Sequence, residues 1–412
     1  DVQVDISGHL TISGAVQSVG AGLQLYAQGD VVIEGTVPAQ ITDANTLPAL
    51  VELLATTDIT VNSGATLTLA DSVWIGNIDD TAAQHITLHA TTDLILGGIL
   101  KSSAQVAATA LNEVGFNASI TAGTLIDIKA GQGASQQGSI ISDIYAELSV
   151  AQGDIHLTAG VQQGDIVLDS SILTTSGNIE LNAANGYVEH TLALMTANLL
   201  QASVQSGVTA KTFVNEMDIQ VTAEGDITLD NASAVTLTRL DAADGVITLV
   251  ALGTVVAEQV STGDGSDANH IVLTTYQMGN VAADLTVDKL LAGGGSDITL
   301  AIQGAVTKTL NGQVVVADQL AITSLAGIDL LTQSRIMTLH TQGAGDVVID
   351  NMFTELLMVE AQIMDGALTL SHAGALRLTQ AELLANRQGN DVTVSASGDI
   401  QVGLVQAGVY YT

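Results

Sequence analysis

The sequence predicts an all-β protein, a parallel β-helix (β-solenoid) with roughly 24 residues per coil, from its composition, a recurring strand unit and the spacing of that unit. The chain of 412 residues is 47% hydrophobic, yet only 2% of its residues are aromatic and 13% are charged. This apolar content is enough for a large core and excludes a disordered chain. Because the chain has no Cys, a disulfide scaffold is excluded as well.

The recurring unit is a turn, often Gly-Asp, followed by apolar residues at alternate positions. It occurs at residues 29–33, 153–157, 225–229, 345–349 and 398–402. Glycine tolerates the backbone conformations of tight turns, and an aspartate carboxylate can accept a hydrogen bond from its own backbone. Alternation with a period of two is typical of a strand with one buried and one solvated face. Each unit is therefore predicted to be a turn that leads into a strand.

The first apolar residue of each strand sets the length of the coil. These anchor residues are Leu10, Val31, Ile59, Ile86, Ile126, Ile155, Ile179, Ile227, Ile247, Ile271, Ile298, Leu320, Val347, Leu368 and Val392. Most steps between them span about 20 to 29 residues, which lies within the range of solenoid repeats. The two longer steps, from Ile86 to Ile126 and from Ile179 to Ile227, each predict two coils in which one anchor is not apparent. The chain is thus expected to form about 16 or 17 coils.

Other repeat architectures fit the sequence less well. Second strands are expected between the anchors, at 164–168, 218–221 and 374–378. Two or three short strands per coil fit a β-helix, whereas a leucine-rich repeat would show its Leu and Asn consensus and a propeller would need longer blades. A transmembrane barrel carries aromatic girdles, and six Tyr, three Phe and one Trp are too few to build them.

The whole chain, 1–412, is expected to be one continuous solenoid and an internal segment of a longer repeat protein. It opens without the basic and apolar regions of a signal peptide, and no polar capping segment is recognisable near Asp1 or Thr412. Two stretches, 39–57 and 186–206, blur the repeat and are the candidate insertions, although 39–57 could instead form a short helix. Insertions in solenoids lie on one face and often contribute to binding.

The charge of the chain excludes two classes of partner. There are 43 Asp and Glu residues against 9 Lys and Arg, which gives a formal net charge of −34. A nucleic-acid binder needs a basic surface to displace counterions from phosphates, so no nucleic-acid partner is expected. Anionic membrane surfaces would repel the chain, and its apolar stretches are too short to cross a bilayer, so no membrane insertion is expected.

The sequence identifies no catalytic, cofactor-binding or metal-binding residue. His85 and His89 have the spacing of a zinc site on a helix, but they lie in a strand pattern and are expected to form a surface pair. The loops 263–267 and 293–297 are acidic and glycine-rich, and they are the calcium candidates, although neither matches a known calcium loop. No cofactor is expected to be required.

A carbohydrate-active enzyme is the rival interpretation, because paired carboxylates could serve glycoside hydrolysis. The candidate pairs are Asp79 with Asp80 and Asp241 with Asp244. The chain offers few basic residues for an anionic polysaccharide and few aromatic platforms for a sugar ring. We therefore expect a protein that is not an enzyme.

The strands at 225–229 and 398–402, in an acidic chain without cysteine, make the sequence resemble the filamentous haemagglutinin-like proteins. The resemblance is one of repeat texture, covers nearly the whole chain and carries no signature site. It implies a giant secreted bacterial adhesin with a right-handed β-helical shaft. The repeats here are longer than is usual in that family, and neither Pro38 nor Pro48 follows an Asn as in its secretion domain. The resemblance therefore implies shaft rather than secretion domain.

The function expected from these observations is structural. The chain would be a non-catalytic shaft of a large secreted or cell-surface adhesin or extracellular filament, located outside the cell or on the bacterial surface. The expected partners are further repeats of the same polypeptide or identical chains end to end, with host-cell or matrix glycans as another candidate. A polysaccharide lyase or hydrolase and a self-assembling sheath protein remain the alternatives.

Overall fold

The structure is a computed structural model of the chain. It describes residues 104–408 apart from 117–118, 133–136, 143–145, 170–171, 264–267 and 310–313. Before residue 104 it describes the strands, and among their side chains only those of Asp93 and Leu94.

Every described element is a β-strand, and the strands build a parallel β-solenoid. Over the described residues they make about 14 turns of roughly 21 residues. The predicted all-β parallel β-helix is confirmed. The right-handed sense of the coil stays a prediction. Among the described residues there is no helix, and hence none of the length and hydropathy that a membrane span requires.

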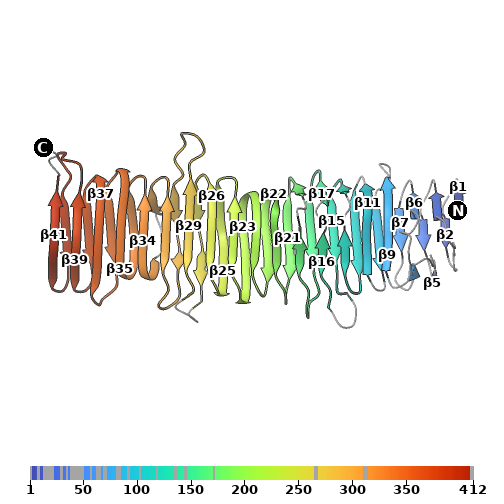
Figure 1. Ribbon diagram of the computed structural model, residues 1–412, viewed down its shortest axis with the longest axis horizontal. Helices are drawn as coiled ribbons and strands as arrows, with labels where there is room; N and C mark the ends of the chain where they lie inside the picture. The colour runs from blue at the N-terminus through green and yellow to red at the C-terminus, as the bar shows by residue number, and fades with distance from the viewer. Residues whose placement is uncertain are drawn as a thin grey trace. The chain divides into compact units, whose positions relative to one another are not determined.

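The contacts within the chain divide it into two compact units, Asp1–Lys211 and Thr212–Thr412. The strands of each unit form columns, in which each strand pairs in parallel with the strand one turn later (Figure 1). Three strands from three columns make one turn. One continuous domain over residues 1–412 stays a prediction.

The first unit contains three such columns and two smaller groups. The first column is β2 (Leu10–Ile12), β4 (Val31–Ile33), β7 (Asp58–Val61), β10 (His85–Ala90), β12 (Gln105–Ala110), β15 (Leu125–Lys129), β18 (Asp154–Thr158), β21 (Asn178–Ala183) and β22 (Val188–Val204). The second is β9 (Ser72–Asp79), β11 (Asp93–Lys101), β13 (Val114–Phe116), β16 (Ile140–Ser142), β19 (Ile166–Leu168) and β22. The third is β11, β14 (Ser119–Ala122), β17 (Glu147–Val150), β20 (Ile172–Thr175) and β22. The smaller groups are β1 (Val2–Ile6), β3 (Leu23–Ala27) and β6 (Val51–Ala55), and β5 (Thr36–Val37) with β8 (Thr66–Leu67).

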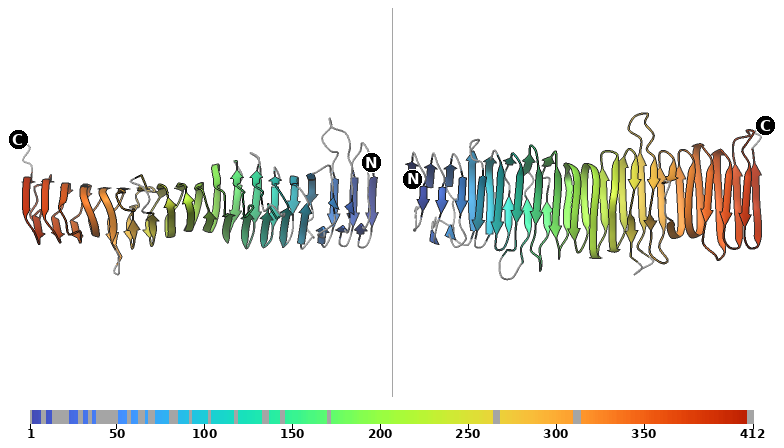
Figure 2. Two further views of the ribbon diagram at one scale, coloured as in Figure 1. Left: turned by 90° about the horizontal axis from the view of Figure 1, so that it is seen from below. Right: turned by 180° about the vertical axis from the view of Figure 1, so that it is seen from behind.

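The second unit has the same organisation, and β23 (Val208–Glu224) contributes to it from Thr212 onward. Its first column is β24 (Ile227–Asn231), β26 (Ile247–Leu252), β29 (Ile271–Tyr276), β32 (Ile298–Ile302), β34 (Val315–Ser324), β35 (Ile328–Ala344), β37 (Leu357–Asp365), β39 (Leu376–Leu383) and β41 (Ile400–Ala407). The second is β25 (Val235–Asp244), β27 (Val255–Ala257), β30 (Leu285–Val287), β33 (Val306–Lys308), β35, β36 (Val347–Asn351), β38 (Leu368–His372) and β40 (Val392–Ala396). The third is β23, β25, β28 (Val260–Thr262), β31 (Leu290–Leu291), β34 and β35. The segment between β29 and β30 projects from this unit (Figure 2).

Like side chains stack on like along each column, which explains the apolar but aromatic-poor composition. In one column Ile271 lies in register with Ile298, and both are fully buried. In the first unit Ile126, Ile155 and Ile179 stack in the same way, each fully buried. Strands of parallel sheets lie about 4.8 Å apart, so each buried aliphatic side chain packs against its equivalents in the turns before and after.

The pairing register of the strands can be compared with the predicted anchors. Val106 pairs with both Ile86 and Ile126, so it is the anchor that was not apparent in the first long step. Leu200 pairs with Ile179 and plays the same role in the second. The predicted length of about 24 residues was too large. One reason is that Leu320 pairs with Met337, a step of about 17 residues, so the predicted step from Leu320 to Val347 joined two different columns.

The expected insertion at 186–206 is wrong, because these residues contain β22, which pairs with strands of all three columns. The repeat blurs there because one continuous strand passes through two corners of the turn. Of the other expected insertion, 39–57, only β6 is described, and the remainder lies outside the described residues.

The aspartates of the Gly-Asp turns connect successive turns rather than capping their own backbone. In the second unit, carboxylate oxygens of Asp226 and Asp346 accept backbone N–H bonds from the next turn, with N···O distances of 2.8 and 2.9 Å. Asp284, which follows Ala283, accepts an equivalent bond at 2.7 Å. Asp154 and Asp165 do the same in the first unit, at 2.7 and 3.1 Å. The prediction of a turn role for these residues is correct in kind. The partner differs because an N–H group of the next turn lies within hydrogen-bond distance of each carboxylate, and backbone N–H groups need an acceptor.

Candidate functional site

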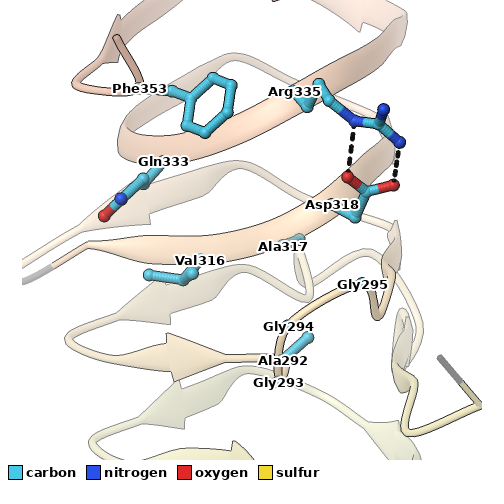
Figure 3. A pocket seen from close by; sticks show the side chains of 10 residues that line it. All are labelled: Ala292, Gly293, Gly294, Gly295, Val316, Ala317, Asp318, Gln333, Arg335 and Phe353. Carbon is cyan, nitrogen blue, oxygen red and sulfur yellow. Dashed lines mark hydrogen bonds and ion pairs between the residues drawn. The ribbon is translucent and has the colours of Figure 1, made fainter. Parts of the chain in front are cut away.

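A shallow pocket of about 170 Å³ lies in the second unit and is the candidate site (Figure 3). It is lined by residues of four successive turns, which meet only because the coil returns to the same side. The lining residues are Ala292, Gly293, Gly294, Gly295, Val316, Ala317, Asp318, Gln333, Arg335 and Phe353.

Each turn contributes a different kind of group to the pocket. The three glycines follow β31 and provide backbone at one end of the pocket. Gly295 has a φ of 90°, a backbone conformation that residues other than glycine rarely adopt. The next turn places Asp318 on β34, and the turn after it places Gln333 and Arg335 on β35. Phe353 comes from the segment between β36 and β37, and it lies near Gln333 and Arg335 at the other end (Figure 3).

Arg335 and Asp318 form a two-pronged ion pair across adjacent turns. Nε and Nη2 of Arg335 each lie 2.8 Å from one carboxylate oxygen of Asp318. The hydrogen bond and the charge of Asp318, together with the charge of Glu355, raise the pKa of Arg335 above its usual range. The pair is partly open to solvent, with 52% of the Arg335 side chain and 20% of the Asp318 side chain exposed. It therefore fixes two planar polar groups at the pocket wall without leaving an unpaired charge.

A buried hydrogen-bond network holds the strand that carries Gln333 and Arg335. Inward-facing Thr332 and Ser334 alternate with these outward residues. The buried Asn351 of the next turn accepts from the Thr332 hydroxyl at 3.1 Å and from the Ser334 N–H at 3.0 Å, and it donates to the Ser334 carbonyl at 2.9 Å. Buried polar networks of this kind restrict the backbone, because each broken bond leaves an unpaired group.

The pocket brings together one carboxylate, one guanidinium, one amide and one aromatic ring. The pocket contains one carboxylate, and that carboxylate is held by the Arg335 guanidinium. General acid–base hydrolysis of glycosides uses two carboxyl groups on opposite sides of the bond. An aromatic ring, an amide and a fixed Arg–Asp pair instead provide one apolar surface and several hydrogen-bonding groups.

The paired carboxylates that the sequence offered for hydrolysis have other positions. Asp241 and Asp244 both lie on β25, where Asp241 accepts a hydrogen bond from the Ser261 hydroxyl at 2.9 Å. Asp244 lies in register with Glu224 of the preceding turn. Neither lines the pocket. Asp80 and the side chain of Asp79 lie outside the described residues.

The metal candidates are placed as follows. The carboxylate of Asp297, in the loop 293–297, accepts a backbone bond from Gln319 at 3.2 Å and lies 3.9 Å from Nδ1 of His270. Most of the loop 263–267 lies outside the described residues, as do the side chains of His85 and His89 on β10. Within the described part of the chain, no three His, Asp or Glu side chains form a group that could hold a metal ion. Calcium dependence stays a prediction.

Sequence reasoning missed Asp318, Arg335 and Phe353. The step that pairs Asp318 with Arg335 is shorter than the average turn, so no regular spacing indicated it. One signal was available, because Phe353 is one of only three Phe in the chain.

No family model, no curated protein and no solved structure matches this chain. The chain is a parallel β-solenoid repeat protein, and the resemblance to filamentous haemagglutinin-like proteins stays a prediction.

Proposed function

We propose that the chain is a non-catalytic structural segment, part of the shaft of a large secreted or cell-surface bacterial adhesin or extracellular filament. The right-handed coil and the filamentous haemagglutinin-like family belong to this proposal. The observation that carries it is the parallel stack of about 14 turns, in which strands pair with the strands of the turns before and after them.

The last turn repeats the core pattern of the turns before it but lacks their burial. Ile400 and Val402 lie in register with Leu376 and Leu378, which are at most 1% exposed. Ile400 and Val402 are themselves 44% and 57% exposed. Val405, which pairs with the fully buried Ala381, is 43% exposed. These side chains therefore have the register positions of core residues.

The physical chemistry of this surface favours continued stacking. Full burial of a Val, Leu or Ile side chain contributes roughly 1.5–3 kcal/mol. Among the described strands β41 pairs with β39 (Figure 1). Open strand edges with apolar faces pair readily with further strands. A further turn of the same polypeptide or a turn of an identical chain supplies both kinds of contact.

The test measures association of the purified chain by sedimentation and electron microscopy over a range of concentrations. We expect end-to-end oligomers that grow with concentration. Val402→Asp should abolish them, because a charge would be buried at the junction. The matched control is Thr393→Asp, which adds the same charge at an exposed outward position of the same turn.

Two results would contradict the proposal. One is a chain that stays monomeric while the amides of β41 are strongly protected from hydrogen exchange, since the end would then be covered from within. The other is release of products from neutral or acidic polysaccharides, which would favour the enzyme.

A further inference from the structure

We propose that the pocket between Phe353 and the Arg335–Asp318 pair binds one uncharged sugar residue of a glycan chain. The inference concerns the side of the second unit and does not depend on stacking at the last turn. Either proposal can therefore fail alone.

Phe353 places an aromatic ring at the pocket. Phe353 is half-buried and sits between two exposed apolar neighbours, Met352 (44% exposed) and Leu356 (47% exposed). An aromatic face in a shallow pocket offers a flat apolar surface, and the C–H face of a pyranose ring has the complementary shape. Exposed apolar side chains that lie close together in this way are typical of interaction sites.

Arg335, Asp318 and Gln333 form a polar wall of the pocket. The fork between Arg335 and Asp318 uses the Nε–H and one Nη2–H donor, so three of the five guanidinium N–H donors are left for other acceptors. Each Asp318 oxygen has further lone pairs. Gln333, on the same strand as Arg335, adds an amide donor and acceptor. Fixed donors next to fixed acceptors match neighbouring hydroxyl groups, each of which both donates and accepts.

The charge around the pocket disfavours an acidic ligand. The positive charge of Arg335 is neutralised by Asp318, and Glu355 adds a further negative charge nearby. With a net charge of −34 on the chain, a uronate or sulfated ligand would be repelled. The charge of the site therefore disfavours acidic ligands. Among the others, the fixed donors and acceptors of the wall favour a ligand with neighbouring hydroxyl groups.

The size of the pocket limits the ligand. At about 170 Å³ the pocket is smaller than the 300–1,000 Å³ typical of sites for drug-sized ligands. It is open to solvent, so it suits a single ring whose neighbours continue along the surface. A single contact of this kind is weak. A glycan with repeated sugar residues would bind more tightly only where several copies of the protein are displayed together.

The experiment uses the full chain immobilised on a sensor. The probes are neutral gluco-, manno-, galacto- and xylo-hexasaccharides, with hexagalacturonate as the acidic comparison. We expect binding of at least one neutral probe and none of the acidic one. Phe353→Ala should weaken that binding about tenfold, and Gln333→Ala should weaken it by a smaller factor.

The matched control is Phe213→Ala. Phe213 is 43% exposed on β23, in the same unit but outside the pocket, so its removal should leave the binding unchanged. The thermal midpoint of each variant is measured alongside, to separate loss of binding from loss of folding. Absence of binding to every neutral probe would overturn the inference, as would equal losses for Phe353→Ala and Phe213→Ala.

Discussion

Two regions of the second unit, residues 212–231 and 332–351, are related by an offset of 120 residues in the sequence, as between Asn231 and Asn351. Identical residues occur at equivalent positions, namely Thr212 and Thr332, Met217 and Met337, Gly225-Asp226 and Gly345-Asp346, and Asp230-Asn231 and Asp350-Asn351. Each region ends in a buried Asn that closes a hydrogen-bond network with the turn before it.

Inside the coil the two networks have nearly the same geometry. Asn231 accepts from the Thr212 hydroxyl at 2.8 Å and from the Val214 N–H at 3.0 Å. Asn351 accepts from the equivalent groups of Thr332 and Ser334 at 3.1 and 3.0 Å. The two regions thus share these acceptor bonds of the buried Asn, because a buried backbone N–H left without a partner lowers stability.

Outside the coil the regions differ. Three residues, 232–234, separate Asn231 from the next buried strand residue, Val235, whereas five residues, 352–356, separate Asn351 from Leu357. The longer segment carries Phe353 and borders the pocket. Stacking therefore constrains the residues inside each turn, whereas the segments outside can change in length without disturbing the core.

The largest expected effect comes from a charge placed inside either region. Leu229→Asp and Ile349→Asp should each destabilise the surrounding turns by at least about 4 kcal/mol, because a carboxylate would be buried without a partner. Both residues are 1% exposed. The measurement is local hydrogen exchange, which reports the stability of neighbouring turns separately.

The controls for this prediction are Thr228→Asp and Val348→Asp, which place the same charge on the exposed outward positions next to Leu229 and Ile349. Their effect should stay within about 0.5 kcal/mol. Similar losses at inward and outward positions would show that the assigned register is wrong.

A smaller effect should distinguish the two buried asparagines. Asn351→Ala leaves the Ser334 N–H and carbonyl without their Asn351 partners, at an expected cost of about 3 kcal/mol. Asn231→Ala should cost less, about 2 kcal/mol, because the Ser233 hydroxyl also donates to the Val214 carbonyl at 2.9 Å. Hydrogen exchange of the amides of Val214 and Ser334 measures both. A greater loss for Asn231→Ala would refute this account of the difference.

The smallest effect concerns the aspartates that the regions share. Asp226→Ala and Asp346→Ala each remove an acceptor for a backbone N–H of the next turn and should cost about 1 kcal/mol. The two losses should be equal, since the bonds have nearly the same length. Asp→Asn at each position is the control, since it retains an acceptor oxygen and should recover most of the loss. Urea unfolding in high salt keeps the altered net charge from dominating the result. Unequal losses at the two positions would contradict the proposed equivalence.

Much of the fold was predictable, because the alternation of apolar residues and the turn residues before them act locally. The anchors Ile126, Ile155 and Ile179 were predicted in the column where they lie. The register failed at Val347, because strands of different columns share one local pattern and sequence distance alone does not tell them apart. The pocket was not predictable in the same way. Its residues come from four turns, and their approach depends on turn lengths that vary from one coil to the next.

The sequence by itself determined that the chain is an all-β solenoid, because a period of two within strands and a longer repeat between them can bury this composition only by stacking. It also determined the net charge of −34, whereas the exclusion of nucleic-acid and membrane partners stays a prediction. Only the tertiary structure decided which strands share a column, which N–H each aspartate accepts from, and that Asp318, Arg335 and Phe353 meet. The physical reason is that each of these contacts joins residues of different turns, and the length of every intervening turn sets the register.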